Sequence, residues 1–176
     1  MTLQITRAVD TDLSELAEVA ASTFPMACPP SSPAADIATF IASHFTEEHF
    51  AHYLEDPNRV LFIARQGQIL GYPMLIRGEP ADADVAHAVP LRPTIELSKM
   101  YTVTQAHGTG AASALMAAAV DVAVADHARC IWLGVNQENQ RAQRFYAKHG
   151  YTVSGTKTFR LGDRVEHDYV MVRTLP

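Results

Sequence analysis

The sequence predicts a single α/β domain that spans residues 1–176. Three observations support this fold class. A chain of 176 residues is the length of one domain, large enough to bury roughly two thirds of the surface that its unfolded form exposes. Hydrophobic residues make up 48% of the chain and charged residues 19%, which is typical of globular proteins. Segments rich in β-favouring residues alternate with segments of helical apolar spacing, so strands and helices share the chain.

The first half of the sequence predicts one strand, three helices and a hairpin. Leu13, Leu16 and Val19 recur at helical spacing behind an aspartate N-cap. Prolines at positions 25, 29, 30 and 33 predict a structured loop after this helix. Pro73 predicts a bulge or a sheet edge within its strand. The expected elements are a strand at about 3–8, a helix that begins at Asp10 or Asp12, helices at about 35–44 and 46–55, and strands at 60–65 and 69–76 joined through Gly67.

The second half predicts a long loop, then strands and helices in alternation, and a closing hairpin. The loop at 78–93 is polar and punctuated by prolines, and loops of this length often carry function. The elements that follow are a strand at 95–103, an alanine-rich helix at 111–125, a strand at 130–135, a helix from about Asn139, and paired strands at 151–160 and 164–173.

The turn between the strand at 95–103 and the helix at 111–125 predicts a phosphate site. Gly108 and Gly110 lie where the helix begins. The free amides and the positive dipole end of a helix attract an anion there, and glycine lets a diphosphate approach the backbone closely.

Two other phosphate loops fit these residues poorly, and an ordinary tight turn remains an alternative. A nucleoside triphosphate loop needs Lys and Ser/Thr after its last glycine, but Ala111 and Ala112 stand there. A dinucleotide-binding turn would have a glycine in place of Ser113 and an acidic residue about twenty positions on, where the next strand instead ends at Asn136.

Two segments resemble the GCN5-related N-acetyltransferase (GNAT) superfamily. The run His107-Gly108-Thr109-Gly110-Ala111-Ala112 is similar to its coenzyme A loop, Gln/Arg-x-x-Gly-x-Gly/Ala, and departs from it at His107. Thr104 also stands where a proline is common. The run from Asn139 to Tyr146, followed by Gly150-Tyr151, is similar to the superfamily's Asn-x-x-Ala-x-x-Phe-Tyr-x-x-x-Gly-Phe/Tyr.

The resemblance implies an α+β variant of the fold and acetyl-CoA as co-substrate, with no metal. The sheet would be mixed, mostly antiparallel and of about seven strands, flanked by about four helices. Its fourth and fifth strands would splay apart to admit the pantetheine arm. The backbone of Met100, Tyr101 and Thr102 would pair with that arm like an added strand. The diphosphate would lie on the amides of His107, Gly108, Thr109, Gly110, Ala111, Ala112 and Ser113.

The resemblance also implies two catalytic residues. Glu96 occupies the position of the glutamate base of histone-acetylating members and would remove the ammonium proton of the acceptor, directly or through a water. The alternative is a solvated carboxylate or an ion pair with Lys99. Tyr146 would protonate the departing coenzyme A thiolate, and helical spacing turns it inward. The alternative is a core tyrosine.

Several other polar residues have two possible roles each. Asn139 either caps its helix or touches the coenzyme, and His107 either contacts a phosphate or faces solvent. The histidines at positions 44, 49 and 52 share a helix face but lack the further ligands that a metal site needs. Acidic residues could line a cation-accepting mouth or simply be solvated, namely Glu47, Glu48, Glu55, Asp82 and Asp84.

Charge and composition limit the partners. The formal net charge of −5 disfavours nucleic acid and favours a cationic substrate. No apolar run approaches the roughly 18 residues of a membrane span, and the N-terminus lacks signal-peptide features, so we expect a soluble cytoplasmic protein. Cys28 and Cys130 are expected to be reduced and inert.

The acceptor is expected to be a small primary amine. The segments at 96–99, 159–163 and 168–171 look most like bacterial polyamine N-acetyltransferases. A protein or peptide amine is the alternative acceptor, and a non-catalytic acyl-CoA-binding module is the alternative function. Family analogy suggests a homodimer.

Overall fold

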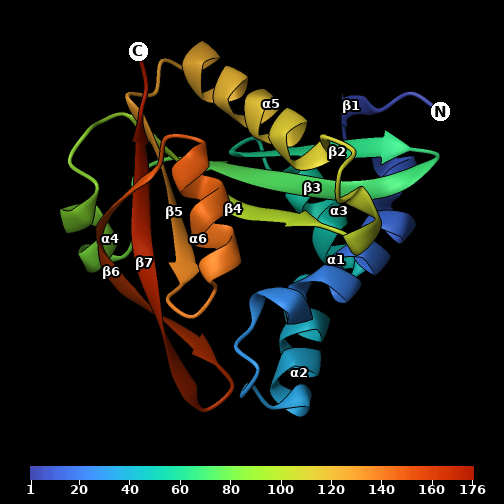
Figure 1. Ribbon diagram of the computed structural model, residues 1–176, viewed down its shortest axis with the longest axis horizontal. Coiled ribbons are helices and arrows are strands. Elements are labelled where there is room, and N and C mark those ends of the chain that lie inside the picture. The colour runs from blue at the N-terminus through green and yellow to red at the C-terminus, as the bar shows by residue number, and fades with distance from the viewer.

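The computed structural model describes residues 1–176 and contains one seven-stranded sheet in the order β1-β2-β3-β4-β5-β7-β6. Only β4 and β5 run parallel to each other, and every other neighbouring pair is antiparallel. The expected mixed, mostly antiparallel sheet of about seven strands is therefore confirmed (Figure 1). The strands are β1 (Gln4–Arg7), β2 (Arg59–Gln66), β3 (Gln68–Arg77), β4 (Thr94–Thr102), β5 (Cys130–Asn136), β6 (Thr152–Leu161) and β7 (Arg164–Thr174).

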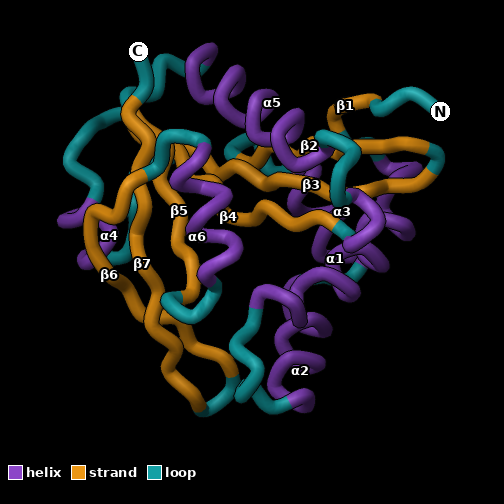
Figure 2. The backbone as a smooth tube through the Cα atoms, in the orientation of Figure 1, coloured by secondary structure: helices purple, strands orange, loops and turns teal.

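Helices lie on both faces of this sheet, and α2 lies below the end of α1, next to the β6–β7 hairpin (Figure 2). On one face, Met116 of α5 and Tyr146 of α6 are buried in the same cluster as Ile95 and Leu97 of β4. On the other face, α1 and α3 pack on β2 and β3, and α4 packs on β5 and β7. The helices are α1 (Leu13–Ala27), α2 (Ala34–His44), α3 (Glu47–Glu55), α4 (Ala83–Ala88), α5 (Ala111–Ala125) and α6 (Gln140–Lys148).

The parallel pair β4 and β5 separates early, as the resemblance predicted. Its ladder has only three residue pairs, which end at Glu96 and Trp132. Beyond that point β4 continues to Thr102 against β3, and β5 continues to Asn136 against β7. The two strands diverge visibly in Figure 1, which leaves the backbone edges of both strands open toward the space between them.

Two predicted loops are partly helical. Helix α1 continues through Pro25 to Ala27, where a loop was expected. Pro25 lies in the last turn, so only one helical N–H is lost, near the end of the helix. The Cys28 N–H still donates to the Pro25 carbonyl at 3.2 Å. The 78–93 segment contains α4, which Asp82 caps by accepting from the amides of Asp84 and Val85. Six residues are too few for helical periodicity to identify this helix.

The irregularity expected at Pro73 lies one residue farther on. The pairing of β3 with β4 shifts between Met74 and Leu75, because Leu97 pairs with Leu75 whereas Lys99 pairs with Met74. Ser98 is therefore an extra residue in β4, a β-bulge. Strand β3 is paired on both sides, so Pro73 does not mark a sheet edge.

Candidate active site

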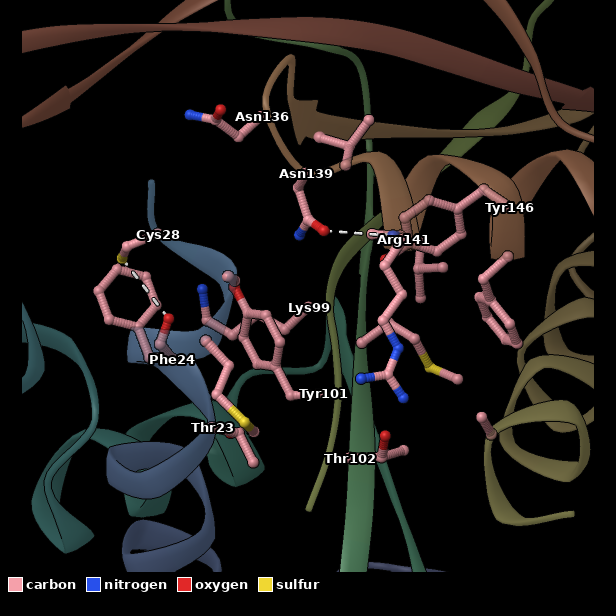
Figure 3. A pocket seen from close by; sticks show the side chains of 18 of the residues that line it. Thr23, Phe24, Cys28, Lys99, Tyr101, Thr102, Asn136, Asn139, Arg141 and Tyr146 are labelled. Carbon is pink, nitrogen blue, oxygen red and sulfur yellow. Dashed lines mark hydrogen bonds between the residues drawn. The ribbon is translucent and has the colours of Figure 1, made fainter. Parts of the chain in front are cut away.

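A cleft of about 770 Å³ opens where β4 and β5 separate, and it reaches both faces of the sheet. Its lining comes from β4 and β5, from the turn before α5, from α6, from the end of α1 with Phe40 of α2, and from the β6–β7 hairpin. Figure 3 shows Phe24, Cys28 and Lys99 on one side of the cleft, and Arg141 and Tyr146 on the other. The part under α5 and α6 is called the loop half here, and the part under α1, α2 and the hairpin is called the chamber.

The loop half is shaped by the two glycines that the sequence singled out. Gly108 and Gly110 have φ values of 78° and 82°, in the left-handed region that favours glycine, and Gly110 is the N-cap of α5. Thr109 holds the turn, because its hydroxyl donates to the Ala106 carbonyl at 2.5 Å and accepts from the Ala111 amide at 3.2 Å.

Several amides of this turn have no partner within the protein. The N–H groups of Gly108, Gly110, Ala112 and Ser113 make no hydrogen bond, while those of Thr109 and Ala111 are used internally. His107 is exposed and lies at the same rim. Free amides together with a helix N-terminus form an anion site, and no protein atom lies within 4 Å of where a Cβ would project from Gly108 or Gly110. The residues present therefore fit a diphosphate.

Helix α6 places Tyr146 inside the cleft. The Asn139 side chain caps this helix by accepting from the Ala142 amide at 3.2 Å, the capping role being one of its two expected roles (Figure 3). Tyr146 is 9% exposed and packs edge-on against Phe145 and Tyr151, with ring centroids 5.6 and 5.8 Å away. Burial raises the pKa of Tyr146 above its ordinary value. Its hydroxyl makes no hydrogen bond within the protein, so it is free to donate one to a ligand.

Strand β4 supplies Glu96 and Lys99 to the chamber because of the bulge at Ser98. Residues three apart on a regular strand face opposite sides of a sheet, and the extra residue cancels that difference. Leu97 packs under α5, whereas the Lys99 ammonium lies 5.0 Å from the Phe45 ring on the other face. Met100, Tyr101 and Thr102, farther along the same strand, also line the cleft.

Glu96 and Lys99 influence each other without forming an ion pair. Burial raises the pKa of Glu96, and the positive charges of Lys99, Lys157 and Arg59 partly oppose that rise. Burial lowers the pKa of Lys99 to about 8, with the Glu96 charge acting in the opposite direction. The two groups therefore share a poorly solvated space that disfavours both charged forms.

The chamber contains two buried acids that sequence reasoning did not select. Glu166 and Asp168 of β7 are each 8% exposed and lie two residues apart, so they share one face. Lys157 of β6 reaches Asp168 at 3.5 Å, and its charge partly opposes the rise in pKa that burial causes for Asp168. The sequence pattern that could have identified these acids is alternation along β7. Val170 and Val172 are buried on the same face as Glu166 and Asp168.

Comparison with known proteins identifies the family. The model of the "Acetyltransferase (GNAT) family" matches residues 16–151. The chain belongs to the GNAT family. It is an acetyl-CoA-dependent N-acetyltransferase, since the family model and a relative 51% identical to it are those of N-acetyltransferases, and a solved structure of the same fold contains coenzyme A.

Relatives cover nearly the whole GNAT chain. An uncharacterized N-acetyltransferase of Mycobacterium tuberculosis is 51% identical over 166 residues, which are 94% of this chain and 99% of the relative. One from Lactobacillus delbrueckii is 23% identical over 175 residues, 98% of each chain. Among solved structures, the PaiA N-acetyltransferase of Thermoplasma acidophilum in complex with coenzyme A has a TM-score of 0.76 at 17% identity, with coverage of 99% of this chain and 100% of that chain.

Another solved structure of similar fold is named for a protein acceptor. The ribosomal-protein-alanine N-acetyltransferase of Brucella melitensis has a TM-score of 0.72 at 20% identity and covers 98% of this chain and 99% of that chain. At such identities the likeness concerns the fold alone, so the acceptor of this GNAT enzyme has to be argued from its own chamber.

Several other candidates lie outside the cleft of this GNAT enzyme. The acidic residues of α3 and the 78–93 segment do not line it, and Asp82 caps α4 instead. The His44 and His49 rings contact the Phe40 carbonyl and the Thr46 hydroxyl, and no group of three or more metal-binding side chains is present. None of the helices combines the length and apolarity that a membrane span requires.

Cys28 lines the chamber as a protonated thiol. Burial raises its pKa to about 11, and the negative charge of Glu166 adds to the effect. Its Sγ lies 3.5 Å from the Phe24 carbonyl as a donor. Because only a thiolate attacks a thioester effectively, this cysteine is poorly suited to carry an acyl group.

Proposed function

We propose that this GNAT enzyme transfers the acetyl group of acetyl-CoA to a primary amine of a small molecule, such as a polyamine, by direct attack within a ternary complex. The observation that carries this proposal is the shape of the cleft. An anion-binding turn opens on one face of the sheet and a carboxylate-bearing chamber on the other, and both meet where β4 and β5 separate. Two substrates can therefore be bound at once, without an acyl-enzyme.

The loop half would hold the coenzyme through backbone groups. The free amides within residues 107–113 suit the diphosphate, and the open edge of β4 at Met100, Tyr101 and Thr102 suits the amides of the pantetheine arm. Acetyl-CoA supplies an activated carbonyl carbon. An amide of this strand would polarise that carbonyl by donating to its oxygen.

Glu96 would act as the general base. An amine with a pKa of about 10.4 is mostly protonated at neutral pH, and exposing its lone pair costs roughly 4 to 5 kcal/mol. Glu96 faces the chamber, and burial raises its pKa, which makes its carboxylate a better proton acceptor than an exposed glutamate. It would take the ammonium proton directly or through a water.

Tyr146 would act as the general acid. Its raised pKa keeps the phenol protonated at neutral pH, and its hydroxyl has no competing partner within the protein. It would donate a proton to the sulfur as the thiolate departs.

The test is thiol release from acetyl-CoA in the presence of polyamines, simple monoamines and peptides with free N-terminal amines. We expect polyamines to stimulate release most. Faster release with peptides would favour a protein acceptor instead, and no stimulation by any amine would refute the proposal. The Glu96→Gln variant should lose rate mainly below the pKa of the acceptor, where the amine needs a base, and should recover part of it at higher pH.

A further inference from the structure

The chain contains three lysines, and all of them line the cleft. Lys148 is exposed on the last turn of α6. Lys157 of β6 is paired with an acid, because its Nζ lies 3.5 Å from Oδ2 of Asp168. Lys99 of β4 differs from both, since its side chain lies in the chamber and its ammonium makes neither a hydrogen bond nor an ion pair with the protein (Figure 3).

The surroundings of Lys99 favour its neutral form. Its Nζ lies 5.0 Å from the centroid of the Phe45 ring. Burial lowers its pKa to about 8, the Glu96 charge opposes that fall, and the Arg59 charge adds to it. At pH 7 about a tenth of this lysine is therefore neutral, compared with roughly one in three thousand for an ordinary lysine. The neutral amine is the form of lysine that attacks a carbonyl carbon.

The course of β4 brings the thioester end of the coenzyme toward this amine. In the proposed function, the diphosphate lies on the amides within 107–113, which follow the end of β4 at Thr102. The pantetheine arm then runs back along the open edge from Thr102 to Met100, so its thioester end comes to the part of the strand that carries Lys99. The bulge at Ser98 turns Lys99 to the same face as Glu96, the proposed base.

We propose that Lys99 is a self-acetylation site, to which the enzyme transfers the acetyl group of bound acetyl-CoA when the chamber holds no acceptor. The inference rests on the proposed function, because the protein's own amine takes the place of the acceptor. The neutral Nζ attacks the thioester carbonyl, a C–N bond forms and the C–S bond breaks. Glu96 takes the proton that the nitrogen loses, and Tyr146 protonates the departing sulfur, so the net change is one proton moved from nitrogen to sulfur.

Self-acetylation changes the chamber in two ways. The amide product is uncharged, which removes the unfavourable burial of an ammonium and should raise the thermal midpoint. The acetylated side chain is also longer and occupies space that an acceptor would use. The modified enzyme should therefore turn over added amines more slowly, and an acceptor present from the start should protect Lys99.

Mass spectrometry of the protein incubated with acetyl-CoA alone tests the proposal. We expect one acetyl group per chain, on the peptide that contains Lys99. Its rate should saturate with acetyl-CoA and be independent of protein concentration, as a reaction within one complex requires. It should be roughly 10- to 100-fold faster than at Lys99 in urea-unfolded protein, because folding both positions the amine and favours its neutral form. Putrescine added at the start should slow the labelling.

Two variants make the result specific. Lys99→Arg keeps a cation at this position and should take up no acetyl group there. Lys148→Arg is the matched control, because it removes an exposed lysine that also lines the cleft, and it should be labelled at Lys99 as fast as the parent. Coenzyme A affinity and the thermal midpoint establish that each variant is folded, and the peptide map of the parent decides the question without them.

The inference is overturned if Lys99 of the parent stays unmodified, or if it is labelled no faster than in the unfolded protein. Thiol release with added amines separates this outcome from failure of the proposed function. If amines stimulate release while Lys99 stays unmodified, amine acetylation stands and self-acetylation alone is wrong. If no amine stimulates release from freshly prepared, unmodified protein, the proposed function itself is wrong.

Discussion

Replacing Lys99 by methionine should stabilise the protein, because burial makes the charge of this lysine costly. The fall in its pKa from 10.5 to about 8 corresponds to about 3 kcal/mol at neutral pH, since each pKa unit is worth roughly 1.4 kcal/mol. Methionine preserves the apolar stem that packs in the chamber. It also removes the interaction with the Phe45 ring at 5.0 Å, worth about 1 kcal/mol.

The net gain should be smaller than this figure. Loss of Lys99 leaves the Glu96 charge with weaker compensation, and solvent in the cleft screens the lysine already. We expect a gain of about 1 to 2 kcal/mol at pH 7, or a rise in the thermal midpoint of roughly 2 to 8 °C for a chain of this size. Thermal unfolding of parent and variant measures it, with the exposed Lys148→Met as a control that should not gain stability.

The dependence on pH gives the decisive check. The folded-state pKa of Lys99 lies below the unfolded value, so the cost is complete below about pH 8 and disappears as pH rises through 10.5. The free-energy cost of burying the charged lysine, before any compensation, should fall from about 3 kcal/mol at pH 7 to about 1 kcal/mol at pH 9.5. If Lys99→Met is no more stable than the parent at pH 7, or if its gain is the same at both pH values, the argument from burial is refuted.

Three further predictions concern the cleft. Tyr146→Phe should lower the rate of thiol release with little change in coenzyme A affinity, and a variant as fast as the parent with every amine would remove the tyrosine from catalysis. Gly110→Ala, at φ 82°, should weaken coenzyme A binding and cost about 1 to 2 kcal/mol of stability, whereas Gly78→Ala, at φ 111° outside the cleft, should cost stability alone. If Gly110→Ala and Gly78→Ala bind coenzyme A with equal affinity, the turn before α5 has no role in binding it. Cys28→Ser should retain turnover, since with a pKa of about 11 roughly one thiol in ten thousand is ionised at pH 7; loss of activity with a normal fold would instead indicate an acyl-enzyme.

The sequence predicted the loop half of the cleft well because its signals are local. The turn at Gly108 and Gly110 and the helix that carries Tyr146 each lie within one continuous segment, and the structure brings both to the gap between β4 and β5. Their catalytic and coenzyme-binding roles stay predictions.

The chamber was harder to predict because it depends on pairing between distant segments. The bulge at Ser98 exists only relative to β3, and without it Glu96 and Lys99 would face opposite sides. Glu166 becomes part of the site only because the β6–β7 hairpin folds back against α2, where Phe159 meets Phe40. The sequence of the hairpin alone, or of α2 alone, contains no pattern that predicts this contact.

The hairpin of β6 and β7 has a consequence for how such enzymes diversify. The match to the family model ends at residue 151, before β6 begins, whereas Lys157, Phe159, Glu166 and Asp168 all follow it. The wall of the chamber that β6 and β7 form therefore lies beyond the residues that the family model matches, whereas the turn before α5 and Tyr146 lie within them. We expect substitutions in the last two strands to alter the shape and charge of the chamber while leaving the turn before α5 unchanged.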